Sequence, residues 1–303
     1  MINRDPYPYN IILKIFAFLI DTNIFISLAA VALTLQTQVQ LGMRPQFHPY
    51  LLLLFFATIF DYNLHRLITV LINKEALNSV KHKWVKQNLL LFYLLVAFSV
   101  LGFCWTVFYA DIKVLIALAP LAGITLFYSL PIFKNKKTIF RLREIPCLKI
   151  FLISFVWSAS TIFLPIIQSS AVFNKEQVVF IFIERFLFVF AITIPFDIRD
   201  MRADAKEKLT TIPILIGKKN ALILSNFVLV LFTLLCVAHY QHTHFVLIIV
   251  AFVLSAISTF YFINSKKMQV KHFYHYGILD GTLLLQGLLV LGCYYLKLLY
   301  NYG

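Results

Sequence analysis

The feature that most constrains this chain is a succession of apolar segments, each long enough to cross a lipid bilayer. A crossing helix needs about 20 predominantly apolar residues, and nine segments reach that length. Membrane strands are excluded because the runs are too long and too continuously apolar for an alternating barrel pattern. We therefore expect an all-α polytopic membrane protein with residues 1–303 in a single domain. The predicted spans cover residues 11–34, 49–72, 88–108, 112–133, 147–167, 177–196, 220–238, 244–264 and 276–299.

The composition excludes a water-soluble fold. Hydrophobic residues make up 61% of the chain and charged residues only 13%, against about 25% charged in an ordinary soluble domain. The four cysteines are scattered through apolar segments without a C-x-x-C pair, so we interpret them as small core residues. The first apolar run is interrupted by Asp21 and Asn23 but continues to Leu35, which exceeds a signal-peptide core. It is therefore taken as the first span.

The distribution of basic residues predicts the orientation of the spans. The chain has 27 Lys and Arg against 13 Asp and Glu, a net charge of +14. These residues lie between apolar runs without a nucleic-acid motif, so nucleic acid is not an expected partner. Two lie within spans and four on one side, which leaves 21 with the N-terminus and the loops after spans 2, 4, 6 and 8. Because Lys and Arg accumulate in cytoplasmic loops, we expect a cytoplasmic N-terminus in a multi-pass protein, of the bacterial inner membrane if the source is bacterial.

Three of the few acids cluster just after the sixth span. Asp197, Asp200 and Asp204 stand at i, i+3 and i+7, so on a helix they share one face. Crowded carboxylates repel one another and require a positive partner near hydrocarbon. Mg²⁺ is suited to such oxygen ligands and also binds the phosphates of a substrate. The alternative is a solvated helix end, with the basic residues between 199 and 208 as ordinary salt-bridge partners.

The residues that follow the aspartates carry a family resemblance. The stretch resembles the second aspartate-rich motif of UbiA-like intramembrane prenyltransferases, D-x-x-D-x-x-x-D followed by Thr, a hydrophobic residue, Pro and then Gly. Thr211, Pro213 and Gly217 match that pattern in order and approximate spacing. Nine spans with the motif just after the sixth are also the layout of the family. The resemblance implies a nine-transmembrane-helix bundle with a central cavity that opens near the cytoplasmic face.

A weaker resemblance follows the fourth span. Tyr128-Ser-Leu-Pro131, with basic residues after it, is similar to a Tyr/Pro/Lys segment of the family. The resemblance implies that this segment binds a substrate diphosphate. For each cation the alternative is ordinary positive-inside charge, and for the tyrosine a satisfied hydroxyl inside the bundle. The candidate diphosphate ligands here are Tyr128, Lys134, Arg141 and Arg143, with Lys149 at the start of the fifth span as a further candidate.

The chain departs from the family at the end of the second span. The family has an N-D-x-x-D-x-x-x-D motif there, whereas residues 60–66 read F-D-Y-N-L-H-R. If Asn63 takes the asparagine position, the first two aspartate positions are occupied by Leu64 and Leu67. The number of metal ions that this half of the site supports is therefore left open.

Two hypotheses address this altered segment. In the first, Asn63 and Arg66, together with the basic loop that follows, bind the diphosphate directly. In the second, Asp61 and His65 form a polar pair at i, i+4 inside the bundle, and the half-site has lost its function. Ionisable groups at membrane depth are commonly functional, which favours the first hypothesis.

Other polar residues have simpler interpretations. Glu184 and Arg185 in the sixth span could pair with each other or with another helix. The histidines within 239–244 lack the spacing of a structural metal site and are expected in a wet interfacial loop.

The resemblance implies a membrane prenyltransferase that transfers an isoprenoid group from an allylic diphosphate to a lipophilic, often aromatic, acceptor with Mg²⁺. Asp197, Asp200 and Asp204 would be its catalytic and metal-binding residues. Its expected partners are a polyprenyl diphosphate, the acceptor and membrane lipids, and the sequence does not specify an oligomeric state. The alternative is a non-catalytic isoprenoid- or lipid-binding member of the same fold. A transporter is disfavoured because paired broken helices are not evident.

Overall fold

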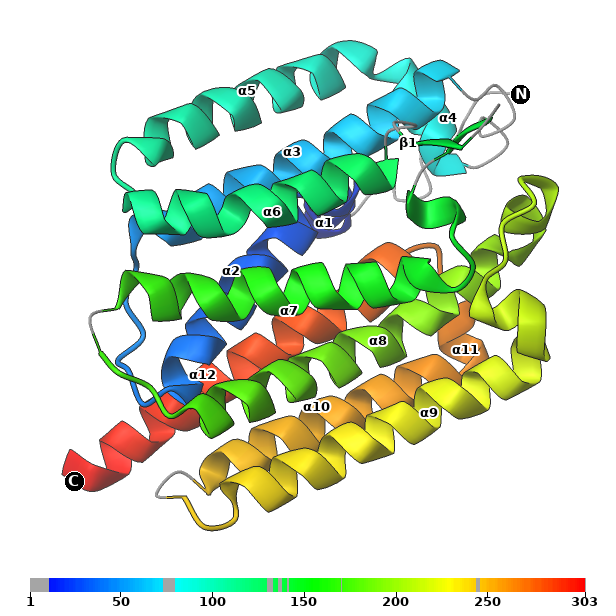
Figure 1. Ribbon diagram of the computed structural model, residues 1–303. Coiled ribbons are helices and arrows are strands. Elements are labelled where there is room, and N and C mark those ends of the chain that lie inside the picture. The colour runs from blue at the N-terminus through cyan, green and yellow to red at the C-terminus, as the bar shows by residue number, and fades with distance from the viewer. Residues whose placement is uncertain are drawn as a thin grey trace.

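The computed structural model describes residues 11–72, 80–129, 133–135, 138–140, 142–169, 171–243 and 246–302. Most of them lie in long helices that run side by side in a bundle (Figure 1). The helices are α1 (Ile11–Asp21), α2 (Ile24–Gln40), α3 (Pro49–Ile72), α4 (Val80–Gln87), α5 (Leu89–Val107), α6 (Ile112–Ser129), α7 (Leu148–Gln168), α8 (Lys175–Lys206), α9 (Ile212–Tyr240), α10 (Leu247–Asn264), α11 (Lys266–Gln269) and α12 (Asp280–Tyr302). The expected helical class is confirmed, with a short antiparallel hairpin of β1 (Phe133–Asn135) and β2 (Thr138–Phe140) between α6 and α7.

The protein is an integral multi-pass membrane protein. Within the described residues, seven helices are long and apolar enough to cross a membrane, and the bent pair α1–α2 raises that number to eight. The apolar part of α6, Ile112–Tyr128, is shorter than these spans. The predicted number of nine spans is therefore not confirmed.

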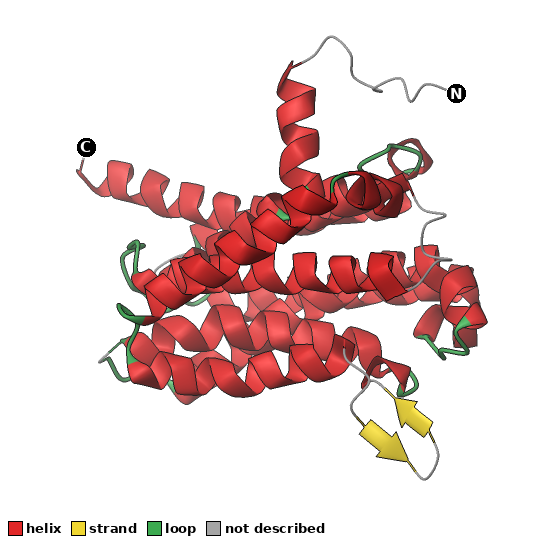
Figure 2. Ribbon diagram, turned by 90° about the horizontal axis from the view of Figure 1, so that it is seen from above, coloured by secondary structure: helices red, strands yellow, loops and turns green. Residues whose placement is uncertain are grey.

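The first predicted span, residues 11–34, is wrong as a continuous helix. α1 and α2 meet at an angle of 75°, and α1 stands away from the bundle in Figure 2. Asn23 at the break adopts a left-handed conformation with φ of 63°, which Asn tolerates better than most residues. Its side-chain amide donates to Asn63 Oδ1 at 2.8 Å, and Asn63 Nδ2 donates to the Thr22 carbonyl at 3.0 Å. The polar interruption in the sequence thus marks a bend between α1 and α2.

Small side chains let the central helices approach closely. α2 packs along α12, and α8 packs between α7 and α9. A Cβ added to Gly287 of α12 would lie 2.8 Å from the backbone of Ala32, so a larger side chain there would push α2 away. Such contacts are typical of helix pairs in membranes, where association depends on packing rather than on the hydrophobic effect.

Helix α8 is longer than the predicted span of 177–196. It continues through Pro195 to Lys206, so all three aspartates of the motif lie on one helix. α9 then starts with Pro213 in its first turn and is kinked at Gly217, whose φ of 80° favours glycine. The α8 C-terminus, α4, the hairpin and α11 lie at the same end of the bundle (Figure 1). The predicted basic loops are therefore gathered at the end that carries the motif.

Candidate functional site

Two buried carboxylates at the end of α8 share one lysine. Asp197 and Asp204 are only 1% and 4% exposed. The ammonium of Lys149, in the first turn of α7, lies 2.7 Å from Asp197 Oδ1 and 3.4 Å from Asp204 Oδ2. The lysine thus supplies a cation to two acids that stand seven positions apart on α8. We call Lys149, Asp197, Asp200 and Asp204 the aspartate site.

The third carboxylate of the site has a different partner. Asp200 accepts hydrogen bonds from Arg199 Nε at 2.7 Å and Nη2 at 2.8 Å, a bidentate pair. The guanidinium also lies 4.8 Å from the ring centroid of Tyr276 and 5.3 Å from that of Phe196. The shared helix face was predicted correctly, but the structure turns Asp200 towards Arg199 rather than Lys149.

The donor chemistry of the site fits a hard divalent cation. Within the described part of the chain, Asp197 Oδ2 is buried and has no hydrogen-bond partner. Carboxylate pairs of this kind suit Mg²⁺, which typically uses one or two protein carboxylates. No group of three or more His, Cys, Asp or Glu side chains is arranged to hold a metal ion among the residues described. Asp197 and Asp204 therefore offer oxygen atoms of the kind that Mg²⁺ binds, and the metal roles of all three aspartates stay predictions.

Aromatic and basic side chains from other helices surround this end. Tyr128 of α6 lies near Lys149, and its ring centroid lies 6.4 Å from that of His65 on α3. Arg66 is 8% exposed, donates to the Asp21 carbonyl at 2.9 Å and lies 5.7 Å from the Tyr276 ring. The structure thus brings Tyr128 to the aspartate site, while Arg66 is bound to the end of α1.

Asp280, at the first position of α12, adds an acid to the same region. It follows a π-helical turn, Tyr274–Leu279, and interacts electrostatically with Arg66 and Arg199. Irregular helical turns of this kind often occur at functional sites. Tyr276 is a residue that no sequence motif pointed to.

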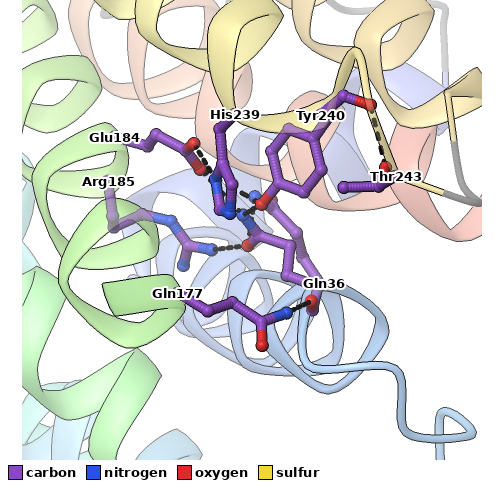
Figure 3. Close-up of polar contacts among 8 residues, drawn as sticks. Gln36, Gln177, Glu184, Arg185, His239, Tyr240 and Thr243 are labelled. Carbon is purple, nitrogen blue, oxygen red and sulfur yellow. Dashed lines mark hydrogen bonds and ion pairs between the residues drawn. The ribbon is translucent and has the colours of Figure 1, made fainter. Parts of the chain in front are cut away.

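A second buried polar cluster lies at the opposite end of α8, about 20 Å from Asp197 by the helical rise. Glu184 is 1% exposed and accepts from His239 Nδ1 at 2.6 Å and from Gln40 Nε2 at 3.1 Å. Arg185 donates to Gln40 Oε1 at 3.1 Å, and Tyr240 lies beside the group (Figure 3). We call Gln40, Glu184, Arg185, His239 and Tyr240 the distal network.

Comparisons with known proteins place the fold and the family. The model described as "UbiA prenyltransferase family" matches residues 80–275. The chain belongs to the UbiA prenyltransferase family. The match includes the α8 motif and begins after α3, so the altered segment at 60–66 lies outside it. Sequence comparison with curated proteins finds no match.

Solved structures share the fold of this UbiA-family protein at low sequence identity. A UbiA homolog from Archaeoglobus fulgidus bound to GPP and Mg²⁺ is 15% identical, with a TM-score of 0.57 over 90% of this chain and 99% of the other. An apo UbiA homolog from Aeropyrum pernix K1 gives the same score and identity over 90% and 98%. A digeranylgeranylglyceryl phosphate synthase is 17% identical, with a TM-score of 0.53 over 93% and 96%.

Asn63 has a full set of partners in the UbiA-family protein. Besides Asn23 and the Thr22 carbonyl, its amide donates to the Ile59 carbonyl at 2.9 Å. Its side chain is wholly buried. These hydrogen bonds fix α3 to the α1–α2 bend. Diphosphate binding by Asn63 stays a prediction, and it would require Asn63 to give up some of these bonds for bonds to phosphate oxygens.

Three of the predicted diphosphate ligands lie outside the described residues or side chains. The backbone of Lys134 is in β1 and that of Arg143 in the 3₁₀ turn Leu142–Glu144, without described side chains, and Arg141 is not described. Their proposed roles rest on the sequence.

Proposed function

We propose that this UbiA-family protein transfers an isoprenoid group from an allylic diphosphate to a lipophilic, aromatic acceptor. The observation that carries the proposal is the buried pair Asp197 and Asp204, which shares Lys149 and leaves one carboxylate oxygen without a hydrogen bond. Homologues of the same fold were solved with GPP and Mg²⁺ and with DMAPP and Mg²⁺, which supports this substrate class.

The charges of the site would act on the departing diphosphate. Asp197, Asp200 and Asp204 would hold Mg²⁺, which supplies charge neutralisation when bound. Arg66 and Lys149, together with Lys134, Arg141 and Arg143 from the loop after α6, would bind the remaining phosphate oxygens. Fixed cations of this kind stabilise the charge that develops on the leaving group as the allylic C–O bond breaks.

Aromatic side chains would protect the allylic cation. Tyr62 of α3 and Trp157 of α7 pack against the same buried core cluster, and Tyr62 lies near Tyr128 and Asp280. These residues come from four helices, α3, α6, α7 and α12. Their π faces can stabilise a carbocation, and the apolar helices exclude water from it until the acceptor attacks.

One observation favours a non-catalytic isoprenoid- or lipid-binding role. Leu67 occupies an expected aspartate position and is 6% exposed, packed with Val70, Val85 and Phe92. An apolar cluster therefore fills the place of one acid in the first half-site. In this second hypothesis the protein binds the diphosphate without turnover.

An assay with purified protein separates the two roles. Labelled dimethylallyl and geranyl diphosphates are incubated with Mg²⁺ and a membrane-lipid extract as acceptor pool. We expect a prenylated product that is lost in Asp200→Asn and kept in Glu176→Gln, a matched loss of charge at the exposed start of α8. Binding without turnover supports the second role, and absence of binding with and without Mg²⁺ contradicts both.

We also propose that the aspartate site faces the cytoplasm. The 21 basic residues of the N-terminus and the loops at this end support the orientation. In intact cells, Lys136→Cys should be protected from an impermeant thiol reagent. Labelling from outside would reverse the topology.

A further inference from the structure

The ammonium of Lys149 lies between the two buried acids, Asp197 and Asp204. Its ammonium lies 2.7 Å from Asp197 and 3.4 Å from Asp204. Its side chain is 14% exposed, so these ion pairs are poorly screened by water. Of the other nearby cations, Arg199 is committed to Asp200 by two hydrogen bonds. Lys149 is therefore the cation that makes burial of Asp197 and Asp204 tolerable in the ligand-free protein.

The backbone around Lys149 is tied to the same acids. The Cys147 N–H donates to the Thr210 carbonyl at 2.8 Å, and the Leu209 N–H donates to the Asp204 carbonyl at 2.8 Å. The start of α7 and the turn after α8 are thus linked. Because the lysine stem is long and flexible, its ammonium can leave the carboxylates while its backbone stays in place.

We propose that Lys149 is a built-in counter-cation that competes with the divalent metal for Asp197 and Asp204, and that its ammonium becomes a ligand of the diphosphate once the metal has entered. The second part of this proposal, diphosphate binding by the Lys149 ammonium, rests on the proposed function. The first half, competition for the carboxylates, concerns metal binding alone. An ammonium released beside the site is within reach of phosphate oxygens, which carry the negative charge that it needs.

The two halves predict opposite effects of one substitution. Lys149→Met keeps most of the side-chain volume and removes the charge. We expect apparent Mg²⁺ affinity without diphosphate to rise roughly tenfold, because the competing cation is gone. We expect affinity for geranyl diphosphate at saturating Mg²⁺ to fall roughly tenfold, because a charged ligand is gone. A purely structural lysine would weaken both affinities together.

The experiment is a calorimetric titration of detergent-purified full-length protein, first with Mg²⁺ and then with geranyl diphosphate. Lys149→Arg retains the charge and should keep both affinities near those of the unsubstituted protein. Lys266→Met, on the exposed surface of α11 at the same end, is the matched control and should change neither. Unchanged or weaker Mg²⁺ binding by Lys149→Met would overturn the competition.

A measurement on the unsubstituted protein removes any dependence on folding of the variant. Amine acetylation at Lys149, read by mass spectrometry, should be slow without ligands, several-fold faster with Mg²⁺ alone, and slow again with Mg²⁺ and geranyl diphosphate. A rate that Mg²⁺ does not change contradicts the proposal. If the Mg²⁺ effect is present and geranyl diphosphate does not bind, the competition stands and the proposed prenyl transfer fails.

Discussion

Charged side chains are buried near both ends of α8, but the partners that stabilise them differ between the two ends. In the distal network, Glu184 accepts hydrogen bonds from His239 and Gln40, and Arg185 donates to Gln40, Thr161 and the Leu33 carbonyl. In the aspartate site, one lysine bridges two carboxylates, and Asp197 Oδ2 has no hydrogen-bond partner among the described residues.

This difference in hydrogen-bond partners indicates that the buried charges of the distal network stabilise the fold, whereas those of the aspartate site are available to a ligand. A buried polar group without a partner costs free energy, whereas a fully bonded network fixes the positions of the helices that share it. The distal network joins α2, α8 and α9 through protein partners. In the aspartate site, Asp197 Oδ2 has no hydrogen-bond partner among the described residues, and a bound cation could supply one. Substitutions at the two ends should therefore separate stability from activity.

The largest expected effect is on activity at the aspartate site. Asp197→Asn keeps the shape of the side chain but removes a buried negative charge. Prenyl transfer, measured by product formation at saturating Mg²⁺, should fall by at least roughly 1,000-fold, the loss typical of removing a strong electrostatic group. Unfolding temperature should change less than in a variant that leaves a buried charge unpaired, because Lys149 keeps Asp204 as its ion-pair partner.

The matched control is Glu184→Gln at the other end of the same helix. It also replaces a buried acid by its amide, and turnover per folded molecule should stay within about twofold. An equal loss of turnover in both variants would show that the distal network takes part in the reaction, and the contrast between the two ends would be lost.

The second effect is on stability at the distal network. Arg185→Met leaves Glu184 without the nearby guanidinium, removes the donor to Thr161 Oγ1 and leaves the Leu33 carbonyl with Thr37 as its only side-chain donor among the described residues. Breaking a buried charged network in this way costs about 3 kcal/mol or more. The unfolding temperature in detergent should fall by at least about 5 °C. Lys175→Met, at the exposed start of α8, should leave it unchanged.

The sequence predicted most helices, because apolar runs bounded by polar residues define them well. The predicted span 49–72 coincides with α3. The bend at Asn23 was missed because two polar residues inside an apolar run were read as an interruption of one helix. Its cause, the bonds between Asn23 and Asn63 across 40 positions, depends on the packed bundle.

The site was predicted to the level of a helix face. Spacing placed Asp197, Asp200 and Asp204 on one side of α8, but the choice of Asp200 for Arg199 depends on side-chain conformation. His239 was expected in a wet loop, which is wrong: it lies in α9 with its side chain 10% exposed, bonded to Glu184 55 positions away. Pairing between distant helices is not encoded in local spacing.

A third, smaller effect tests Asn63, which is fully bonded like the distal network although it lies near the aspartate site. Asn63→Ala removes three hydrogen bonds at the α1–α2 bend, so we expect a loss of about 2 kcal/mol in stability. Affinity for geranyl diphosphate, measured on the folded fraction, should stay within about threefold. A selective loss of diphosphate binding with unchanged stability would support the predicted role of Asn63 as a diphosphate ligand.

The smallest expected effect is on stability and concerns His239, at the edge of the distal network. His239 Nδ1 donates to the Glu184 carboxylate at 2.6 Å, and the imidazole stacks on the Phe180 ring with 5.0 Å between the ring centroids. His239→Gln keeps a donor for the carboxylate but loses the stacked ring, so stability should fall by about 1 kcal/mol or less, with turnover unchanged. His239→Leu removes the donor as well and should cost clearly more. If both variants unfold at the same temperature, the hydrogen bond to Glu184 contributes nothing, and completeness of bonding would no longer distinguish the two ends of α8.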